Sequence, residues 1–338
     1  MVTIKDVAEL AGVSKSTVSR VLVNKIPVNK DTKIKVMNAI KELDYRPNML
    51  AKGLKEGKTN TVGLIIPNIR NPFYPAVARG VEDGASKNGY SIVLCNTDEN
   101  EEEEIRYINN LRNRFVDGLI ICTASTDGKF IKELHNNKFP VVLLARDIPV
   151  VEVDTVMTPD FKGAYEVTSY LIAKGHTRIS IINGNMNIPS FNQRFQGYCA
   201  ALRDHNIPLD DRIVLNISTT VTMQESYDLM SKLLDNGVIP TAVFATSDSK
   251  AIGAIKAIQD KRYNVPRDIS VIGFGDIDVS KFMAPSLTTY AQPIYDMGLM
   301  AFERLLKLIK AKKAIKPVII KAEGQIVERD SVAEIEKL

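Results

Sequence analysis

The chain has 338 residues, with 44 Lys and Arg against 40 Asp and Glu, and therefore a net charge of +4. It shows no signal peptide and no long apolar run, which argues against secretion and membrane insertion and predicts a cytoplasmic protein. The three cysteines lie in or near apolar stretches without a CxxC pair, as expected of reduced core residues. The three histidines lack metal-ligand spacing, so we expect neither a metal site nor a cofactor.

Positive charge is concentrated at the N-terminal end. Residues 1–58 contain 12 Lys and Arg against 6 Asp and Glu, a net of +6, which leaves 32 against 34, a net of −2, for residues 59–338. This asymmetry is typical of a small nucleic-acid-binding module fused to a neutral globular body. Charge alone is equally compatible with a solvated basic terminus, so the interpretation depends on the motif in this segment.

Residues 3–22, TIKDVAELAGVSKSTVSRVL, have the pattern of two short helices joined by a tight turn. Thr3 can cap the first helix, with Asp6 returning the bond in a capping box. Gly12 stands where the chain must turn, and Ser14 can cap the second helix, 14–22. A third helix at about 31–44 completes a small core, for which helical spacing predicts Val7, Leu10, Ala11, Val18, Val21, Ile34, Met37, Ile40 and Leu43.

The outward side chains of the second helix are suited to DNA. In a helix-turn-helix this helix enters the major groove, and its outward residues contact base edges. An arginine there can bond guanine with two N–H groups, and hydroxyls can bond phosphates. The groups expected at bases are Lys15, Ser16 and Arg20, and those expected at phosphates are Ser14, Thr17 and Ser19. An ordinary helical hairpin with a solvated basic face remains the alternative for this segment.

A short helix is predicted to begin at Pro47, within the stretch YRPNMLAKGLK at 45–55. It is too short to be stable alone in water. A helix that orders only on DNA could insert Leu54 between base steps of the minor groove and kink the duplex. The alternative is a linker whose leucines pack on the next domain.

From residue 61 onward, short apolar runs alternate with helical patterns. The runs are 62–67, 90–96, 117–123, 141–145, 179–183, 241–247 and 269–274, and the helical stretches include 74–88, 101–114, 161–174, 195–205, 225–236 and 248–261. This order predicts an α/β fold with parallel sheets flanked by helices. About 280 residues exceed one usual sheet core, so we expect two lobes.

Ligands of such folds bind in crevices at the carboxyl ends of strands. The residues after the predicted strands are 71–74, Arg146, 190–194, 247–248 and 275–276. They offer aromatic rings for stacking and charged groups for hydroxyls or an acid. This composition predicts a small polar metabolite, a sugar or a sugar derivative.

Together these residues resemble the LacI/GalR family of bacterial transcription regulators. The match runs from TIKDVAELAGVSKSTVSRVL through YRPNMLAKGLKEGKTNTVGLIIPNIRNPFY to VIGFGDIDVSKFMAPSLTTYAQP, essentially the whole chain. The resemblance implies a helix-turn-helix headpiece, a hinge helix and a two-lobed body of the type I periplasmic-binding-protein kind. It also implies a nucleoid-associated homodimer that reads a pseudopalindromic operator in double-stranded DNA. The end of the chain, 332–338, is too short for a heptad tail, so a dimer is expected.

The resemblance assigns a domain to each part of the chain and a role to particular residues. The domains are a headpiece at 1–46, a hinge helix and linker at 47–59, and a body at 60–338, with an N-lobe of about 60–160 and 290–322 and a C-lobe of about 161–289 and 323–338. The implied DNA-binding residues are Thr3, Ser14, Lys15, Ser16, Thr17, Ser19, Arg20, Asn24, Ala51, Leu54 and Lys55. The implied effector-binding residues are Phe73, Tyr74, Arg146, Ser190, Arg194, Asp248 and Asp276.

Two of these assignments leave alternatives open. Asp248 could instead cap the following helix, and Asp276 could serve an irregular turn. Arg194 is expected to need an anionic or polyhydroxyl partner. Many sugar-binding members have an acid where this chain has Gly275, so an anionic sugar acid or sugar phosphate would meet less repulsion beside Arg194.

The predicted function is ligand-controlled repression of a carbohydrate-utilisation operon, in which the effector acts through its different affinity for two states of the body. An enzyme is disfavoured because the chain lacks GxGxxG, P-loop, nucleophile-elbow and HExxH patterns. A transport-type binding protein is disfavoured by the headpiece. The main alternative is a global carbon-catabolite regulator whose corepressor is a phosphorylated carrier protein, docked around residues 76–84.

Overall fold

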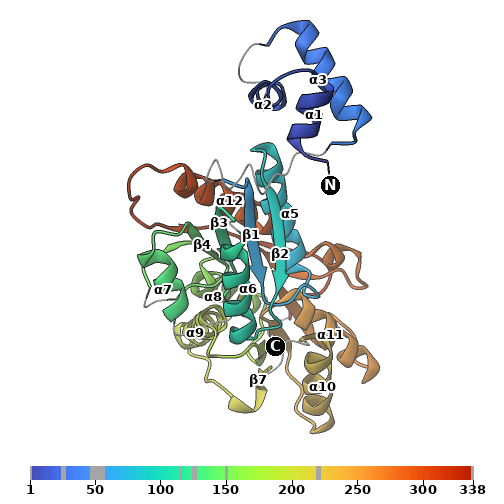
Figure 1. Ribbon diagram of the computed structural model, residues 1–338. Helices are drawn as coiled ribbons and strands as arrows, with labels where there is room; N and C mark the ends of the chain where they lie inside the picture. Colours follow the sequence, from blue (N-terminus) through green and yellow to red (C-terminus); the bar gives the residue numbers. More distant parts are fainter. Residues whose placement is uncertain are drawn as a thin grey trace. The chain divides into compact units, whose positions relative to one another are not determined.

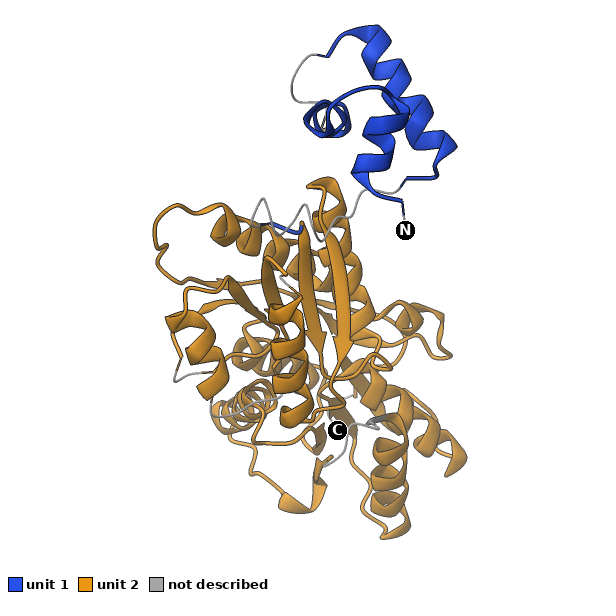
Figure 2. Cartoon of the chain, in the orientation of Figure 1, with its two compact units in different colours: residues 1–59 blue, residues 60–338 orange. Residues whose placement is uncertain are grey.

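The computed structural model describes residues 2–23, 28–45, 58–114, 116–123, 128–148, 151–217 and 222–335 (Figure 1). The chain divides into two compact units, residues 1–59 and residues 60–338 (Figure 2). Asn24, Ala51, Leu54 and Lys55, which were expected at DNA, lie outside the described residues.

The first unit contains three helices, α1 (Ile4–Leu10), α2 (Lys15–Val23) and α3 (Lys30–Glu42). The carboxylate of Asp6 accepts hydrogen bonds from the backbone N–H of Thr3 at 2.7 Å and from its hydroxyl at 2.9 Å, which fixes the start of α1. Gly12 has a φ of 64° in the turn before α2. The hydroxyl of Ser14 accepts from the N–H of Thr17 at 3.2 Å, as an N-cap does.

The core of the first unit is built from small side chains. Its buried members are Val7, Ala8, Ala11, Val18, Val21, Val36 and Ala39. The prediction was wrong for Leu10, Ile34 and Met37, which are 48%, 59% and 50% exposed. Apolar spacing in α3 fits two helix faces, and the face carrying the smaller residues is the one that lets three short helices pack closely. Ile40 and Leu43 pack partly buried against this core.

The second unit contains two six-stranded sheets. The first has the strand order β11-β5-β4-β3-β1-β2, and its strands pair in parallel. Its strands are β1 (Thr61–Ile66), β2 (Ser91–Asn96), β3 (Gly118–Ile121), β4 (Val141–Leu144), β5 (Asp154–Met157) and β11 (Ile319–Lys321). Helices α5 (Phe73–Lys87) and α12 (Ile294–Lys310) cover one face, and α6 (Glu101–Asn113) and α7 (Lys129–Asn136) cover the other (Figure 1).

The second sheet has the order β12-β10-β9-β8-β6-β7 and is parallel except where β12 runs antiparallel to β10. Its strands are β6 (Ile179–Asn183), β7 (Val214–Asn216), β8 (Ala242–Ala245), β9 (Ser270–Gly275), β10 (Thr288–Ala291) and β12 (Gln325–Val327). Helices α8 (Asp160–Ala173) and α9 (Pro189–Asp204) cover one face, and α10 (Thr222–Asp235) and α11 (Asp248–Asp260) the other. Two short 3-10 helices, η1 (Asp211–Ile213) and η2 (Asp278–Phe282), complete this lobe.

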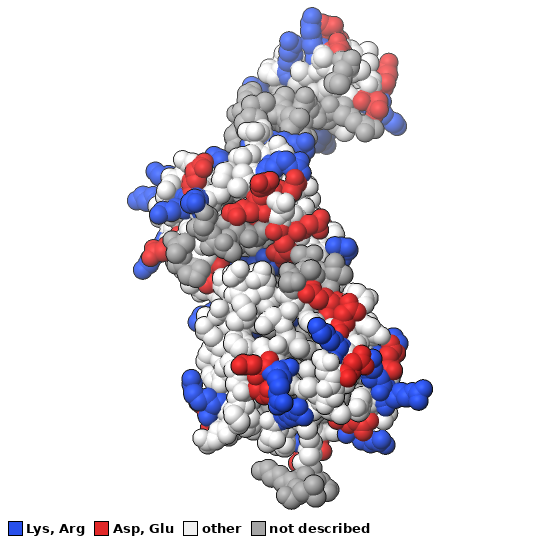
Figure 3. Space-filling model, turned by 90° about the horizontal axis from the view of Figure 1, so that it is seen from below, with Lys and Arg blue, Asp and Glu red and all other residues white. Residues whose placement is uncertain are grey.

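The chain passes three times between the two sheets, from β5 to α8, from β10 to α12 and from β11 to β12. Two of the crossing segments are tied together, because the side-chain amide of Gln292 donates to the hydroxyl of Thr158 at 2.7 Å. Acidic and basic side chains are interspersed on the face drawn in Figure 3. Within the part of the chain that the structure describes, no helix combines the length and apolar character needed to cross a membrane.

Candidate functional site

The N-terminal end of α2 presents a compact set of hydroxyls to solvent. The Ser14 hydroxyl lies 2.7 Å from that of Ser16 and 2.9 Å from that of Thr17. Lys15, Ser16 and Arg20 are exposed, and Val18 is buried against the core. Since the first backbone N–H groups of a helix lack intrahelical acceptors, this end of α2 can bind an anion such as a phosphate oxygen.

The other residues of the first unit that were expected to contact DNA are either less exposed or already hydrogen-bonded to a neighbouring residue. Thr17 and Ser19 are half-buried. Thr3 is exposed, but both its N–H and its hydroxyl donate to Asp6, and these two hydrogen bonds lower the pKa of the Asp6 carboxyl. The geometry therefore makes Lys15, Ser16 and Arg20 the side chains of α2 that can reach a partner molecule.

The second unit contains a cavity of about 310 Å³ between its two lobes. Six of the seven expected effector residues line it: Phe73, Tyr74, Arg146, Ser190, Arg194 and Asp248. They follow parallel strands: at the start of α5, in the segment after β4, at the start of α9 and at the start of α11. The cavity thus lies at the carboxyl ends of both sheets, where α/β folds bind ligands.

Arg146 is held by a fork of charged hydrogen bonds on the N-lobe side of the cavity. Its guanidinium donates to both carboxylate oxygens of Glu99, each at 2.6 Å, and to the backbone carbonyl of Thr123 at 3.0 Å. A longer contact of 3.4 Å reaches the hydroxyl of Tyr74. Burial raises the pKa of Tyr74, so its hydroxyl stays protonated and can both donate and accept hydrogen bonds.

Arg194 occupies the corresponding position on the C-lobe side. It pairs with Asp160 at 2.7 Å, donates to the carbonyl of Thr246 at 2.5 Å, and stacks over Phe274 with 3.9 Å to the ring centroid. Burial raises the pKa of Asp160, and the guanidinium opposes that rise. Arg194 therefore already has a carboxylate partner in the chain, which the sequence argument for an external anion did not include.

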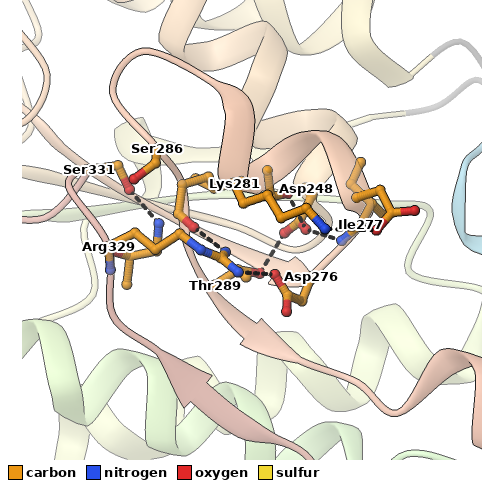
Figure 4. Close-up of polar contacts among 12 residues, drawn as sticks. Asp248, Asp276, Ile277, Lys281, Ser286, Thr289, Arg329 and Ser331 are labelled. Atoms are coloured by element: carbon orange, nitrogen blue, oxygen red, sulfur yellow. Dashed lines mark hydrogen bonds and ion pairs between the residues drawn. The ribbon is translucent and has the colours of Figure 1, made fainter.

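Asp248 is engaged by three donors from other elements (Figure 4). Its carboxylate accepts from the N–H of Ile277 at 2.9 Å, from the hydroxyl of Ser280 at 2.8 Å and from that of Thr289 at 2.5 Å. Burial raises its pKa, and these hydrogen bonds oppose the rise. The cap of α11 is the neighbouring Ser247, so Asp248 instead ties α11 to the loop after β9 and to β10.

Asp276 does not line the cavity, contrary to the expectation. Its carboxylate forms an ion pair of 2.6 Å with Arg329 (Figure 4) and faces a separate surface hollow beside Arg70 and Tyr295. Gly275 has a φ of 145° and Asp276 a φ of 62°, so the chain changes direction directly after β9. That turn leaves Gly275 at the cavity and directs Asp276 away from it.

Sequence reasoning missed the most unusual group in the cavity, Lys250. Its residue is 1% exposed, and its Nζ lies 3.5 Å from the Ser247 hydroxyl and 4.2 Å from the centroid of the Phe191 ring. Among the described residues, no carboxylate forms an ion pair with it. Burial, followed by the charge of Arg194, lowers its pKa to about 7.

The contacts that Lys250 makes offset only a small part of the free energy that burying its ammonium group costs. A cation–π contact is worth about 0.5–2 kcal/mol, whereas burying an ammonium ion costs several kcal/mol. Sequence offered little signal here, because a lysine in a helix normally extends its charge into water. Its position three residues after the cap of a helix that follows a strand was the clue available.

The charges that line the cavity are three cations and three carboxylates: Arg146, Arg194, Lys250, Glu99, Asp160 and Asp248. Both arginines have a carboxylate partner, but Lys250 and Asp248 do not pair with each other. Aromatic rings of Phe73, Phe191 and Phe274 supply the apolar part of the lining. Such a mixture of rings and directed polar groups is typical of a site for a small polar molecule.

Comparisons with known proteins agree with both units. Residues 3–48 match the model for bacterial regulatory proteins of the lacI family, and residues 59–326 match the model for periplasmic binding proteins and the sugar binding domain of the LacI family. The HTH-type transcriptional regulator RegA of Clostridium saccharobutylicum is 37% identical over 335 residues, covering 97% of this chain and 98% of that protein.

Two further similarities extend over nearly the whole chain. Catabolite control protein A of Priestia megaterium is 36% identical, with 98% of this chain and 99% of that protein covered. The solved structure of the Lac repressor dimer bound to operator and the anti-inducer ONPF aligns with 98% of this chain and 99% of its own, at a TM-score of 0.88 and 27% identity. The chain is therefore a helix-turn-helix regulator of transcription with a two-lobed α/β body, and it belongs to the LacI family of bacterial regulatory proteins.

Proposed function

We propose that this chain represses a carbohydrate-utilisation operon, and that a small sugar or sugar-derived effector in the cleft controls its affinity for the operator. The observation that carries the proposal is that one chain combines an exposed polar end of α2 with a buried, ring-lined polar cavity. A protein that binds chromosomal operators acts in the cytoplasm, beside the nucleoid.

For the headpiece, we propose that Lys15, Ser16 and Arg20 read base edges, since these side chains of α2 are exposed. The phosphate contacts are assigned to Thr3, Ser14, Thr17, Ser19 and Asn24. In the segment 47–59, a hinge helix would insert Leu54 into the minor groove, with Ala51 and Lys55 beside it. This division makes 1–46 the headpiece and 60–338 the body.

For the body, we propose that the effector binds in the cavity between an N-lobe of about 60–160 and 290–322 and a C-lobe of about 161–289 and 323–338. Its volume of about 310 Å³ is at the small end of ligand pockets, as suits a monosaccharide-sized molecule. Phe73 and Phe191 can stack on a sugar face, and Ser190 and Arg146 can bond hydroxyl groups.

Control of DNA binding then follows from linkage. An effector that touches both lobes favours the arrangement in which both sets of contacts form, and it changes operator affinity only by its differential affinity for the two arrangements. The hydrogen bond between Thr158 and Gln292, which joins two of the crossing segments, lies at the position where a change of lobe angle must be accommodated.

We also propose a homodimer, since a pseudopalindromic operator requires a twofold partner. Phe282 is 78% exposed in η2, and Val279 in the same short helix is also exposed. A second copy would remove this apolar surface from water.

The alternative is a global carbon-catabolite regulator that uses a phosphorylated protein corepressor, favoured by the similarity to catabolite control protein A. The surface expected for such a partner, residues 76–84 of α5, carries Arg79, which is paired with Glu82 at 2.9 Å and with Asp83 at 2.6 Å. A corepressor would have to compete with these local pairs.

The test is to capture fragmented genomic DNA on the full-length protein at near-physiological salt and to sequence the retained fragments. Salt is needed because nonspecific phosphate binding falls steeply with ionic strength. A few pseudopalindromic sites beside a catabolic operon would support the local repressor and nominate its effector. Many dispersed sites, or retention only with an added phosphorylated carrier protein, would favour the alternative.

A further inference from the structure

Lys250 is buried in the cavity without a negative partner among the described residues. It is the third residue of α11, and its ammonium lies against the Phe191 ring and near the Ser247 hydroxyl. Neither of these groups carries a charge. The side chain nevertheless lines the same cavity as Arg146 and Arg194, so it is directed toward the space that a ligand would occupy.

The other charges of the cavity leave Lys250 as the unsatisfied one. Glu99 is used by Arg146, and Asp160 is used by Arg194. The two carboxylate oxygens of Asp248 accept hydrogen bonds from Ile277, Ser280 and Thr289.

Position 275 is a glycine at the cavity wall and supplies no acid either. Substituting an acid there would also be strained, because the φ of Gly275 is 145°, a conformation that residues with a side chain rarely adopt. This part of the wall therefore does not provide a counter-charge for the ammonium group.

We propose that Lys250 determines the charge of the effector: the cavity takes a small polyhydroxylated molecule with one carboxylate or phosphate group, which binds the ammonium of Lys250. The inference rests on the proposed effector cleft and specifies what enters it. An anion placed there would give the Lys250 ammonium the counter-charge that the cavity lacks for it, whereas a neutral sugar would offer none.

A proton is coupled to this binding. The groups that act on Lys250 are Arg194 of α9 and Arg146 after β4, which disfavour its charge, and Glu225 of α10, which favours it. The Asp248 carboxylate, on the same helix, is held by its three donors. Burial lowers the pKa of Lys250 to about 7 in the ligand-free protein, so its side chain is mostly uncharged at pH 8. An anionic ligand raises that pKa and draws in a proton, as linkage requires.

The experiment is calorimetric titration of the full-length protein at pH 8 with matched probes: glucose and galactose, their uronates and aldonates, and their 6-phosphates. Repeating each titration in buffers of different ionisation enthalpy gives the number of protons taken up. We expect only anionic probes to bind, with close to one proton taken up. Comparing the uronates and aldonates with the 6-phosphates shows whether the cavity prefers a carboxylate or a phosphate group.

Lys250→Met tests the residue itself. This variant should lose roughly 10- to 150-fold in affinity for the anionic probe, as expected for a lost hydrogen bond to a charged group, and its proton uptake should disappear. Lys256→Met, on the same helix but at the surface, is the matched control and should change neither quantity. A merely structural role for Lys250 would not alter the proton count.

Two results would overturn the inference. If neutral sugars bind and their anions do not, or if Lys250→Met binds the anion with unchanged affinity and proton uptake, the cleft remains an effector site but Lys250 does not set its charge. If no probe of either class binds, while operator capture succeeds, both this inference and the proposed metabolite cleft are wrong and a protein corepressor is favoured.

Discussion

The two recognition surfaces of this chain handle charge in opposite ways. On α2, Lys15 and Arg20 are exposed, so their charges are solvated and are available to bind another molecule. In the cleft, Arg146, Arg194 and Lys250 are buried, and two of them have carboxylate partners. Exposed charges contribute little to stability because water and salt screen them, whereas buried charges must be compensated. Substituting the exposed charges of α2 should therefore change DNA binding alone, and substituting the buried charges of the cleft should also change stability.

The largest effect is expected from breaking the buried pair. Arg194→Ala leaves Asp160 buried without its partner and should lower the free energy of unfolding by about 3–5 kcal/mol. Arg79→Ala, which breaks exposed pairs on α5, should cost at most about 1 kcal/mol. Urea unfolding followed by circular dichroism measures both, since the chain has no Trp.

The double variant Asp160→Asn, Arg194→Met provides the control for the first prediction. Because it removes both charges, it should recover a large part of the stability lost in Arg194→Ala. Equal losses in the single and double variants would mean that the packing of the guanidinium over Phe274, and not charge pairing, holds this side of the cavity.

The second prediction concerns Lys250 in the ligand-free protein. Its pKa is about 7 in the folded protein and near 10.4 in the unfolded chain, so its stability cost is absent above about pH 10.4. The cost grows as the pH falls toward 7 and stays constant below that value. Lys250→Met should thus stabilise the protein by a few kcal/mol (order of magnitude) at pH 7, with the gain fading by pH 10. A pH-independent gain would mean that packing, and not charge, is responsible.

The headpiece was largely predictable because its signals are local. The Asp6 carboxylate, the Gly12 turn and the Ser14 cap act within a few residues of one another. Core membership was less predictable, because apolar spacing in α3 fits two faces, and Ile34 and Met37 lie on the exposed one.

In the body, each of the seven apolar runs overlaps a strand, namely β1, β2, β3, β4, β6, β8 and β9. The strands that were missed, β5, β7, β10, β11 and β12, have only three or four residues. Two of their pairings join distant parts of the chain, since β11 pairs with β5 and β12 with β10. Helices α7 and α12 were not singled out either.

The cleft depends still more on contacts between distant residues. Arg146 and Glu99 are 47 positions apart, and Arg194 and Asp160 are 34 apart. A pattern in the sequence can place an arginine after a strand, but it cannot show which carboxylate the fold brings beside it. The same limit explains Asp276, whose partner Arg329 is 53 positions away.

The third prediction tests the exposed surface. Arg20→Ala should weaken binding to the operator by about 1–3 kcal/mol, roughly 10- to 150-fold, because a base contact is lost. Binding to random DNA should change little. Fluorescence anisotropy at fixed salt, with the operator found by genomic capture, measures both.

Lys35→Ala is the matched control for Arg20→Ala, since it removes one exposed positive charge from α3 instead of α2. It should have a small effect that is equal on the two DNAs. If Arg20→Ala also weakens operator and random DNA equally, Arg20 contacts a phosphate and does not read a base.

The smallest effect is expected at Ser14, where a stabilising role and a DNA role meet in one side chain. Its hydroxyl caps α2 by accepting from the N–H of Thr17, so Ser14→Ala should destabilise the first unit by about 1 kcal/mol and weaken DNA binding as well. Ser14→Asp separates the two roles. An aspartate caps a helix as well as serine does and suits the positive end of the helix dipole, so thermal stability should be retained. The same carboxylate would repel a phosphate, so DNA binding should fall below that of Ser14→Ala. If Ser14→Asp instead binds DNA as well as the wild type, the α2 N-terminus does not face the backbone, and the docking proposed for this helix is wrong.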